Sequence, residues 1–130
     1  MLERVVAEGA SDLHLSARLR PRWRIDGTVR EIRDAAILGA DEVFSLLSPL
    51  MREEIVDEFQ QTNDCDFAIS LKDYARFRVN LFRDDKGASA VLRLIPSKIL
   101  SVGQLGLPPV ILELAKQPKG LVLITGATGL

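Results

Sequence analysis

Residues 76–82 read Arg-Phe-Arg-Val-Asn-Leu-Phe, and this alternation decides the fold class. Apolar side chains at Phe77, Val79 and Leu81 take every second position, which is the period of a β-strand with one buried and one exposed face. The arginines and the asparagine between them fall on the exposed face. The stretch therefore predicts a strand in a sheet that is covered on one side only.

The same period continues on both sides of this strand. Residues 65–71 alternate before it, and residues 88–95 follow it after the polar loop 84–87 and stop at Pro96. Strands that follow one another through short loops pair antiparallel. We therefore expect an antiparallel sheet in this part of the chain.

The chain opens with a helix and a small group of strands by the same criteria. Residues 2–8 have a helical pattern, and alternation predicts strands at residues 11–16, 21–26 and 28–32. Asp26-Gly27, between the last two, is a favoured two-residue hairpin turn.

Between the two groups of strands the apolar period changes to three and four residues. Residues 43–50 predict a helix, and Ile55, Val56 and Phe59 form the buried side of a second one, with Pro49 in its first turn. Helices on one face of an antiparallel sheet define an α+β fold. This is the fold class we predict for residues 1–96.

A second domain is expected further along the chain. Residues 97–109 are rich in glycine, proline and small polar residues and are interpreted as a linker or hinge. Residues 110–116 predict a helix, and the apolar run 121–125 (LVLIT) predicts a strand covered on both faces, as in a parallel sheet. Residues 110–130 are therefore interpreted as the truncated start of an α/β domain.

Composition limits the classes of function. The 130 residues are 47% apolar and 27% charged, which is typical of a globular protein. One cysteine excludes a disulfide framework, and with one histidine it gives no support to a metal site. A net charge of −1 offers no attraction to nucleic acid or anionic lipid. The lack of a membrane-spanning apolar run and of a secretory signal favours the cytoplasm.

The last residues contain a candidate phosphate-binding loop. Gly126, Ala127, Thr128 and Gly129 follow the predicted strand and match the start of the pattern G-x-x-x-x-G-K-[ST]. In such a loop backbone N–H groups converge on the phosphates, a lysine adds charge and a hydroxyl binds Mg²⁺. The lysine and hydroxyl positions lie beyond Leu130, so we expect no catalytic residue in the chain and neither ATP binding nor hydrolysis by it alone. An ordinary glycine turn after a strand also satisfies this short pattern.

Three arginines form a second candidate site. Arg76 and Arg78 point to the same face of their strand, and the loop at 84–87 brings Arg93 back on the neighbouring strand. Guanidinium groups this close repel one another unless an anion, such as the phosphates of a nucleotide, or nearby acids compensate them. The acids available for this are Asp64, Asp66 and Asp73. A solvated strand face with surface ion pairs is the alternative.

Three conspicuous side chains are given no chemical role, and His14 is interpreted as a structural or surface residue and Cys65 as an inert thiol. His14 has no polar partner that the sequence identifies, and Cys65 has no basic neighbour to lower the pKa of its thiol. Trp23 is expected in the core. No nucleophile, general base or carboxylate pair stands out.

Several motifs occur together in an order that resembles the pilus-retraction ATPases of twitching motility, the PilT family. They are ASDLHL (10–15), RIDG (24–27), RFRVN (76–80), RLIPSK (93–98), LGLP (105–108) and KGLVLITG (119–126). The set covers nearly the whole chain and is more specific than any one motif. Ala127 and Leu130 depart from the family pattern, which has proline and serine there.

The resemblance implies a PAS-like N-terminal domain, a flexible linker and the first helix and strand of a RecA-like ATPase domain. The family works as a homo-hexamer in the cytoplasm, at the inner face of the cytoplasmic membrane at a pilus base. Its partners are the neighbouring ATPase cores and an inner-membrane platform protein, without nucleic acid or insertion into the membrane.

The resemblance also implies how ATP is used. ATP and Mg²⁺ are cofactors of the complete enzyme, and arginines at the positions of Arg76, Arg78 and Arg93 approach the nucleotide from outside the phosphate loop. ATP binding bridges two domains, and hydrolysis lets them rotate about residues 97–109.

Two other readings stay open. A pilus-extension or type II secretion ATPase shares much of the pattern but usually carries a further N-terminal domain. A PAS-like sensor or interaction module without hydrolysis would have a ligand pocket within residues 1–96 and no Gly-Lys-Ser/Thr downstream.

Overall fold

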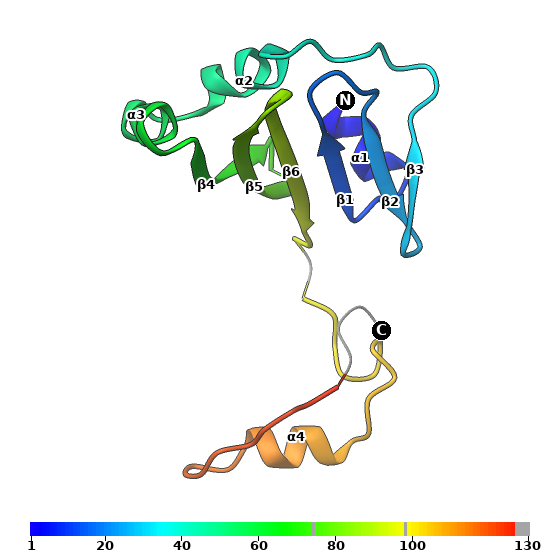
Figure 1. The fold of residues 1–130 in the computed structure, drawn as a ribbon. Helices are drawn as coiled ribbons and strands as arrows, with labels where there is room; N and C mark the ends of the chain where they lie inside the picture. The colour runs from blue at the N-terminus through cyan, green and yellow to red at the C-terminus, as the bar shows by residue number, and fades with distance from the viewer. Residues whose placement is uncertain (74, 98, 127–130) are drawn as a thin grey trace. The chain divides into compact units, whose positions relative to one another are not determined.

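The computed structural model describes residues 1–73, 75–97 and 99–126. The chain divides into two compact units, residues 1–97 and residues 98–130, and each is considered by itself (Figure 1).

The first unit is built on one antiparallel sheet. Within the described residues its order is β3-β2-β1-β6-β5-β4, and every neighbouring pair is antiparallel. The strands are β1 (Asp12–Leu15), β2 (Arg22–Ile25), β3 (Thr28–Glu31), β4 (Asp64–Leu71), β5 (Ala75–Asp84) and β6 (Gly87–Ile95). Its helices are α1 (Leu2–Ala7), α2 (Glu42–Leu47), the 3₁₀ turn η1 (Ser48–Leu50) and α3 (Glu53–Thr62). The strands predicted from alternation are all present.

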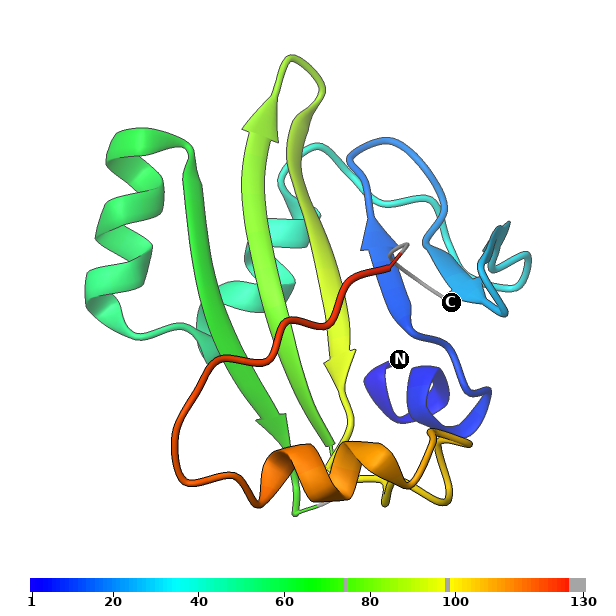
Figure 2. The same cartoon turned by 90° about the horizontal axis from the view of Figure 1, so that it is seen from below.

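One face of the sheet is apolar and carries the core. Leu13, Leu92 and Val79 lie in register across β1, β6 and β5, and each is at most 1% exposed. The helices add further buried side chains to the same cluster, namely Val5, Val43, Leu47 and Phe59. Figure 2 shows α2 behind β4, β5 and β6. The predicted α+β class, an antiparallel sheet with helices packed on it, is confirmed.

Two turns use left-handed backbone conformations. Asp26 (φ 49°) and Gly27 (φ 77°) join β2 to β3, as a type I′ hairpin requires, so the predicted turn is confirmed. Gly87 (φ 133°) begins β6, and a side chain there would collide with the carbonyl oxygen of Ala40. The Ala88 N–H donates to that carbonyl at 2.9 Å. This close approach fastens the segment before α2 to the β5–β6 turn.

The connection between α2 and α3 differs from the prediction. Pro49 lies in η1 and not in the first turn of the following helix, which begins at Glu53. The reason is that Met51 and Arg52 adopt extended backbone (ψ 144° and 153°) and separate the two elements. The chain can then turn so that Phe44 stacks on Phe59 at 5.3 Å between ring centroids.

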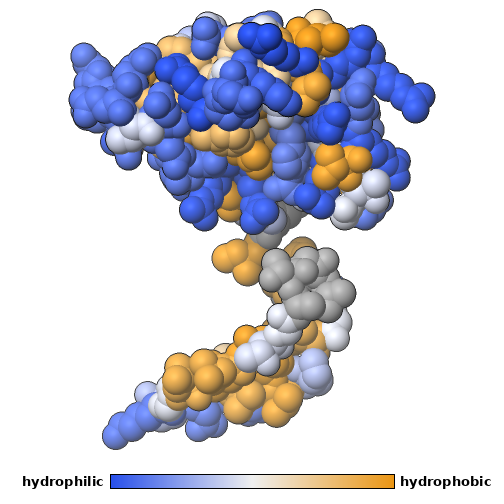
Figure 3. All heavy atoms as spheres, in the orientation of Figure 1, coloured by the Kyte–Doolittle hydropathy of each residue, from blue (hydrophilic) through white to orange (hydrophobic). Residues whose placement is uncertain are grey.

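The second unit contains α4 (Val110–Ala115), close to the predicted helix at 110–116. The strand predicted at 121–125 is wrong for this structure, because none is assigned anywhere in the described residues 99–126. An extended segment becomes a strand only when a neighbour pairs with its backbone. Leu121, Leu123 and Ile124 are accordingly 82%, 76% and 80% exposed. Figure 3 shows hydrophobic residues, in orange, gathered on the visible face of this unit. Among the described residues, no helix is both long and apolar enough to span a bilayer.

Candidate anion-binding site

The face of the sheet opposite the core is polar and rich in arginine. Strand alternation places every second residue there, and the antiparallel register then sets those residues side by side. One cross-strand row runs Arg24, Asp12, Arg93 and Arg78 through β2, β1, β6 and β5. Arg76 lies on the same face of β5, two residues before Arg78 and opposite Ile95.

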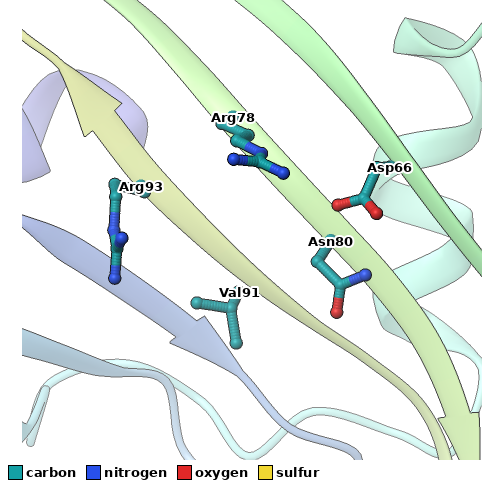
Figure 4. Close-up of a pocket in the computed structure, with 5 residues that line it drawn as sticks. All are labelled: Asp66, Arg78, Asn80, Val91 and Arg93. Atoms are coloured by element: carbon teal, nitrogen blue, oxygen red, sulfur yellow. The ribbon is translucent and has the colours of Figure 1, made fainter.

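The structure brings the three predicted arginines together. Arg78 and Arg93 are direct cross-strand partners, as the sequence predicted. They line a shallow hollow of about 180 Å³, whose remaining lining residues are Asp66, Asn80 and Val91 (Figure 4). Figure 4 shows the Arg78 side chain directed toward Asp66 and that of Arg93 directed toward β1. Arg76 and Arg78 both line an adjoining hollow of about 290 Å³.

The arginines differ in their acidic partners. Arg93 forms an ion pair with Asp12 at 3.0 Å between Nε and Oδ1, and its side chain is still 73% exposed. Arg76 and Arg78 form no ion pair with any carboxylate in the described part of the chain. Both residues are exposed. Two guanidinium groups on this face therefore carry charge that no ion pair within the described residues neutralises.

The acids expected to compensate the arginines do not do so. Asp64 accepts a hydrogen bond from the Asn80 side chain at 3.0 Å, and Asp66 and Asp73 only line hollows beside Arg78 and Arg76. The acid that pairs with Arg93 is Asp12, which lies 81 positions away in sequence on another strand. Nothing in the spacing of segment 64–73 could reveal this pairing, because β1 lies beside β6 only through the topology of the sheet.

Asp12 is a buried carboxylate on this face that contacts two of its arginines. The residue is 5% exposed, and its carboxylate accepts from Arg93 Nε at 3.0 Å and from Ser11 Oγ at 2.8 Å. Arg24 Nε lies 3.4 Å from Asp12 Oδ2, the oxygen that also accepts from Ser11. Burial alone would raise the pKa of Asp12, but the hydrogen bonds from Arg93 and Ser11 and the charges of Arg93 and Arg24 hold that pKa below its usual value. The carboxylate is therefore ionised at neutral pH.

His14 lies on the same face, one row further along, between Arg22 on β2 and Val91 on β6. Its Nε2 is buried and has no hydrogen-bond partner within the described residues. Burial lowers the pKa of His14, and Arg24 and Arg22 lower it further, against an opposing effect of Asp12. The ring is therefore neutral at pH 7 and adds no positive charge to the face.

The remaining conspicuous residues take the structural roles predicted for them. Cys65 is buried, and this burial, with nearby Glu58, Asp64 and Asp66, raises the pKa of its thiol to about 11, so the thiolate form is disfavoured. Trp23 is 8% exposed in the core, and the Arg4 guanidinium lies 5.1 Å from its ring centroid.

The exposed guanidinium groups of this arrangement have the chemistry to bind an anion. Exposed guanidinium groups donate several N–H bonds in a planar fork that matches phosphate. Of the predicted phosphate-loop residues, Gly126 is described, whereas Ala127, Thr128 and Gly129 lie outside the described residues. The described residues also contain no group of three or more His, Cys, Asp or Glu placed to hold a metal ion.

Comparison with known proteins points to one family. The family model described as type II/IV secretion system protein matches residues 1–130. The chain is 43% identical over 122 residues to the type IV pilus retraction ATPase PilT of Pseudomonas aeruginosa, covering 94% of this chain and 35% of that protein. It is 38% identical over 109 residues to a twitching motility protein of Neisseria gonorrhoeae, covering 84% of this chain and 29% of that protein. The chain thus spans about a third of the length of these relatives.

Solved structures agree with the sequence comparison. A crystal structure of the pilus retraction motor PilT with bound ADP superposes with a TM-score of 0.83 at 33% identity, over 98% of this chain and 37% of that one. The ATPase DotB of Legionella pneumophila gives 0.76 at 24% identity over the same shares, which shows a common fold. The resemblance to the PilT family is confirmed, and the chain belongs to the type II/IV secretion system protein family.

Proposed function

We propose that this chain is the N-terminal part of an ATPase motor that powers retraction of type IV pili. In this proposal residues 1–96 form the PAS-like domain, residues 97–109 the hinge and residues 110–130 the start of a RecA-like domain. The retraction and twitching-motility relatives support this assignment, at 43% and 38% identity.

The arginine face gives the chain its part in the nucleotide site. The observation that carries this step is that Arg76 and Arg78 have no acidic partner among the described residues while lining a shared hollow. A cation on a protein surface without a counter-ion is available to an anionic ligand, and the phosphates of ATP match the geometry of guanidinium. We infer that Arg76, Arg78 and Arg93 stabilise the phosphates of a nucleotide bound mainly by a phosphate loop.

The loop itself is assigned to the segment that begins at Gly126. Gly126 to Gly129 would supply backbone N–H groups, and residues after Leu130 would supply the lysine and the hydroxyl that binds Mg²⁺. ATP and Mg²⁺ are therefore cofactors of the longer protein, and we expect the chain alone neither to bind nor to hydrolyse ATP. The bound ADP in the PilT structure supports the choice of an adenine nucleotide.

The assembly we propose is a homo-hexamer in the cytoplasm at a pilus base. The arginine face of one subunit would meet the ATPase core of its neighbour, and the ring would act on an inner-membrane platform protein. ATP would bridge two domains through charge-assisted contacts, and hydrolysis would release them to rotate about residues 97–109.

The test uses the longer protein encoded by the gene. Arg78→Ala and Arg93→Ala should each lower ATPase turnover about tenfold or more, because each removes a group that stabilises phosphate charge, while the circular dichroism spectrum stays unchanged. Arg4→Ala on α1 is the control with normal turnover expected. Unchanged turnover in both site variants, or a reading frame without Gly-Lys-Ser/Thr directly after Leu130, would overturn the proposal.

A second candidate function is pilus extension or type II secretion. The chain is 33% identical to the type II secretion system protein E of Aeromonas hydrophila and 31% identical to the pilus assembly ATPase PilB of Acinetobacter baylyi. Complementation separates these functions, because a retraction ATPase restores twitching to a retraction-deficient strain that still assembles pili. A sensor module without hydrolysis predicts no ATPase activity in the longer protein at all.

A further inference from the structure

The arginine row contains a charge conflict. Arg93 lies directly opposite Arg78, and like charges at paired positions of a sheet destabilise it. The full row holds three arginines and one aspartate, which leaves a formal charge of +2. The position and orientation of that one aspartate therefore decide how the row presents its charge.

Asp12 contacts Arg93 through Nε alone. It accepts from Nε, at 3.0 Å, which is the nitrogen nearest the stem of the guanidinium group. The two terminal nitrogens of Arg93 make no hydrogen bond with any residue the structure describes, and the side chain is 73% exposed. Arg93 is thus held through Nε, whereas its two terminal nitrogens have no hydrogen-bond partner among the described residues.

Another arginine of the chain shows the opposite arrangement. Arg4 donates from both terminal nitrogens to Asp34, at 2.7 and 3.0 Å, so this pair occupies the tip that would otherwise contact a ligand. Arg4 belongs to α1 and packs against Trp23, a residue of the core. The two pairs use the same residue types, and only the Asp12 pair leaves terminal donors available.

We propose that Asp12 is the positioning residue of the arginine site, which consists of Arg76, Arg78 and Arg93. This inference rests on the proposed function. Its buried carboxylate orients Arg93 through Nε–H, so that both terminal nitrogens face outward as a fork for one phosphate. Arg24, 3.4 Å from the second carboxylate oxygen, together with the hydroxyl of Ser11, holds the carboxylate in place. Because Arg93 is ordered before the ligand arrives, binding costs less side-chain entropy.

The first experiment measures the contact itself in the 130-residue chain. In ¹⁵N-arginine spectra, we expect the Nε–H of Arg93 to exchange with water at least several-fold more slowly than those of Arg76 and Arg78. Asp12→Asn should abolish this protection, and Asp34→Asn, the matched control, should not change it. Equal exchange at Arg93 and Arg76 in the unmodified protein would overturn the proposal, and this comparison requires no variant to fold.

The second experiment asks whether Asp12 acts through Arg93. In the longer protein, Asp12→Asn should lower kcat about threefold to tenfold with little change in KM, and Asp34→Asn should leave both unchanged. In an Arg93→Ala background, Asp12→Asn should have no further effect, because residues that act as a unit are not additive. The same loss of kcat in both backgrounds would show a merely structural role and overturn the proposal.

The controls separate this inference from the proposed function. If Arg93→Ala lowers turnover and Asp12→Asn does not, the positioning role is wrong and the nucleotide role of the arginines stands. If neither Arg78→Ala nor Arg93→Ala changes turnover, the proposed function fails and the positioning role fails with it.

Discussion

The two faces of the sheet are built from the same strands but differ in character: one is apolar and buried, and the other is polar and exposed. On β5, Phe77, Val79 and Leu81 are 0% exposed, whereas Arg76 and Arg78 between them are exposed. The apolar face is covered by helices and filled by one cluster of side chains. The polar face instead carries cations that exceed the acids paired with them. Adjacent residues in the sequence therefore lie on faces of opposite character, and in our proposal one face serves stability and the other the nucleotide site.

This separation explains why the polar face can carry uncompensated charge. Stability comes mainly from buried apolar area, so exposed arginines need contribute nothing to it. Among the charged side chains described on the polar face, Asp12 is the exception, because it is buried. Substitutions on each face measure how complete this separation is.

The largest effect should come from the apolar face. Phe77→Ala removes a fully buried ring from the centre of β5 and leaves a cavity. We expect a loss of about 3–5 kcal/mol in the free energy of unfolding, measured by urea denaturation. A loss below about 1 kcal/mol would mean that this face is not the core.

A smaller effect is expected at Asp12. Asp12→Asn should lower the unfolding free energy at pH 6 by about 1 kcal/mol, which is less than usual for charged hydrogen bonds because water screens the exposed Arg93. The folded-state pKa of Asp12 is below its ordinary value of 3.8, so its contribution is present above that pH and lost as the pH falls through the folded pKa. The difference between the two proteins should shrink below about pH 4. A difference that is constant from pH 6 to pH 3 would contradict the ionic role.

His14 should have a small effect on stability that also depends on pH, but here the fold favours the uncharged form of the side chain. Its folded-state pKa lies below 6.5, so its contribution to stability is complete above that pH and falls as the pH decreases through the folded pKa. Because it is the single histidine of the chain, one ¹H–¹⁵N titration reports it without overlap. A measured pKa at or above 6.5 would contradict the burial of this ring.

The smallest effect on stability should come from the arginine site itself. Arg78→Gln should change the unfolding free energy by no more than about 0.5 kcal/mol, because this exposed side chain has no ion pair to lose within the described residues. The same variant should impair ATP turnover of the longer protein. A loss of stability comparable to that of Phe77→Ala would show that the two faces are not separate.

Local sequence patterns predicted most of the fold, because they encode local geometry. The alternation at 76–82 and the Asp26-Gly27 turn each specify a conformation within a few residues. The start of the predicted helix that contains Ile55, Val56 and Phe59 was misjudged at Pro49, because a proline is compatible with the first turn of either η1 or α3. Residues 121–125 carry the composition of a buried strand, but pairing requires neighbours that the described residues do not provide.

The candidate site was predictable in part for the same reason. Arg76, Arg78 and Arg93 could be grouped because they belong to consecutive strands joined by a short loop. Asp12 and Arg24 could not be added to them, because the pairing of β1 with β6 joins segments about eighty positions apart. The alternation in segment 11–16 places Asp12 on the polar face of its strand, which predicts an exposed side chain. The structure instead buries it.

The most direct test of the account is a structure of the longer, assembled protein with a non-hydrolysable ATP analogue. The account predicts terminal guanidinium nitrogens of Arg78 and Arg93 about 2.7–2.9 Å from phosphate oxygens, with Arg93 Nε still bound to Asp12. An analogue held in the phosphate loop while both arginines remain beyond hydrogen-bond reach, more than about 3.5 Å away in every subunit, would contradict it.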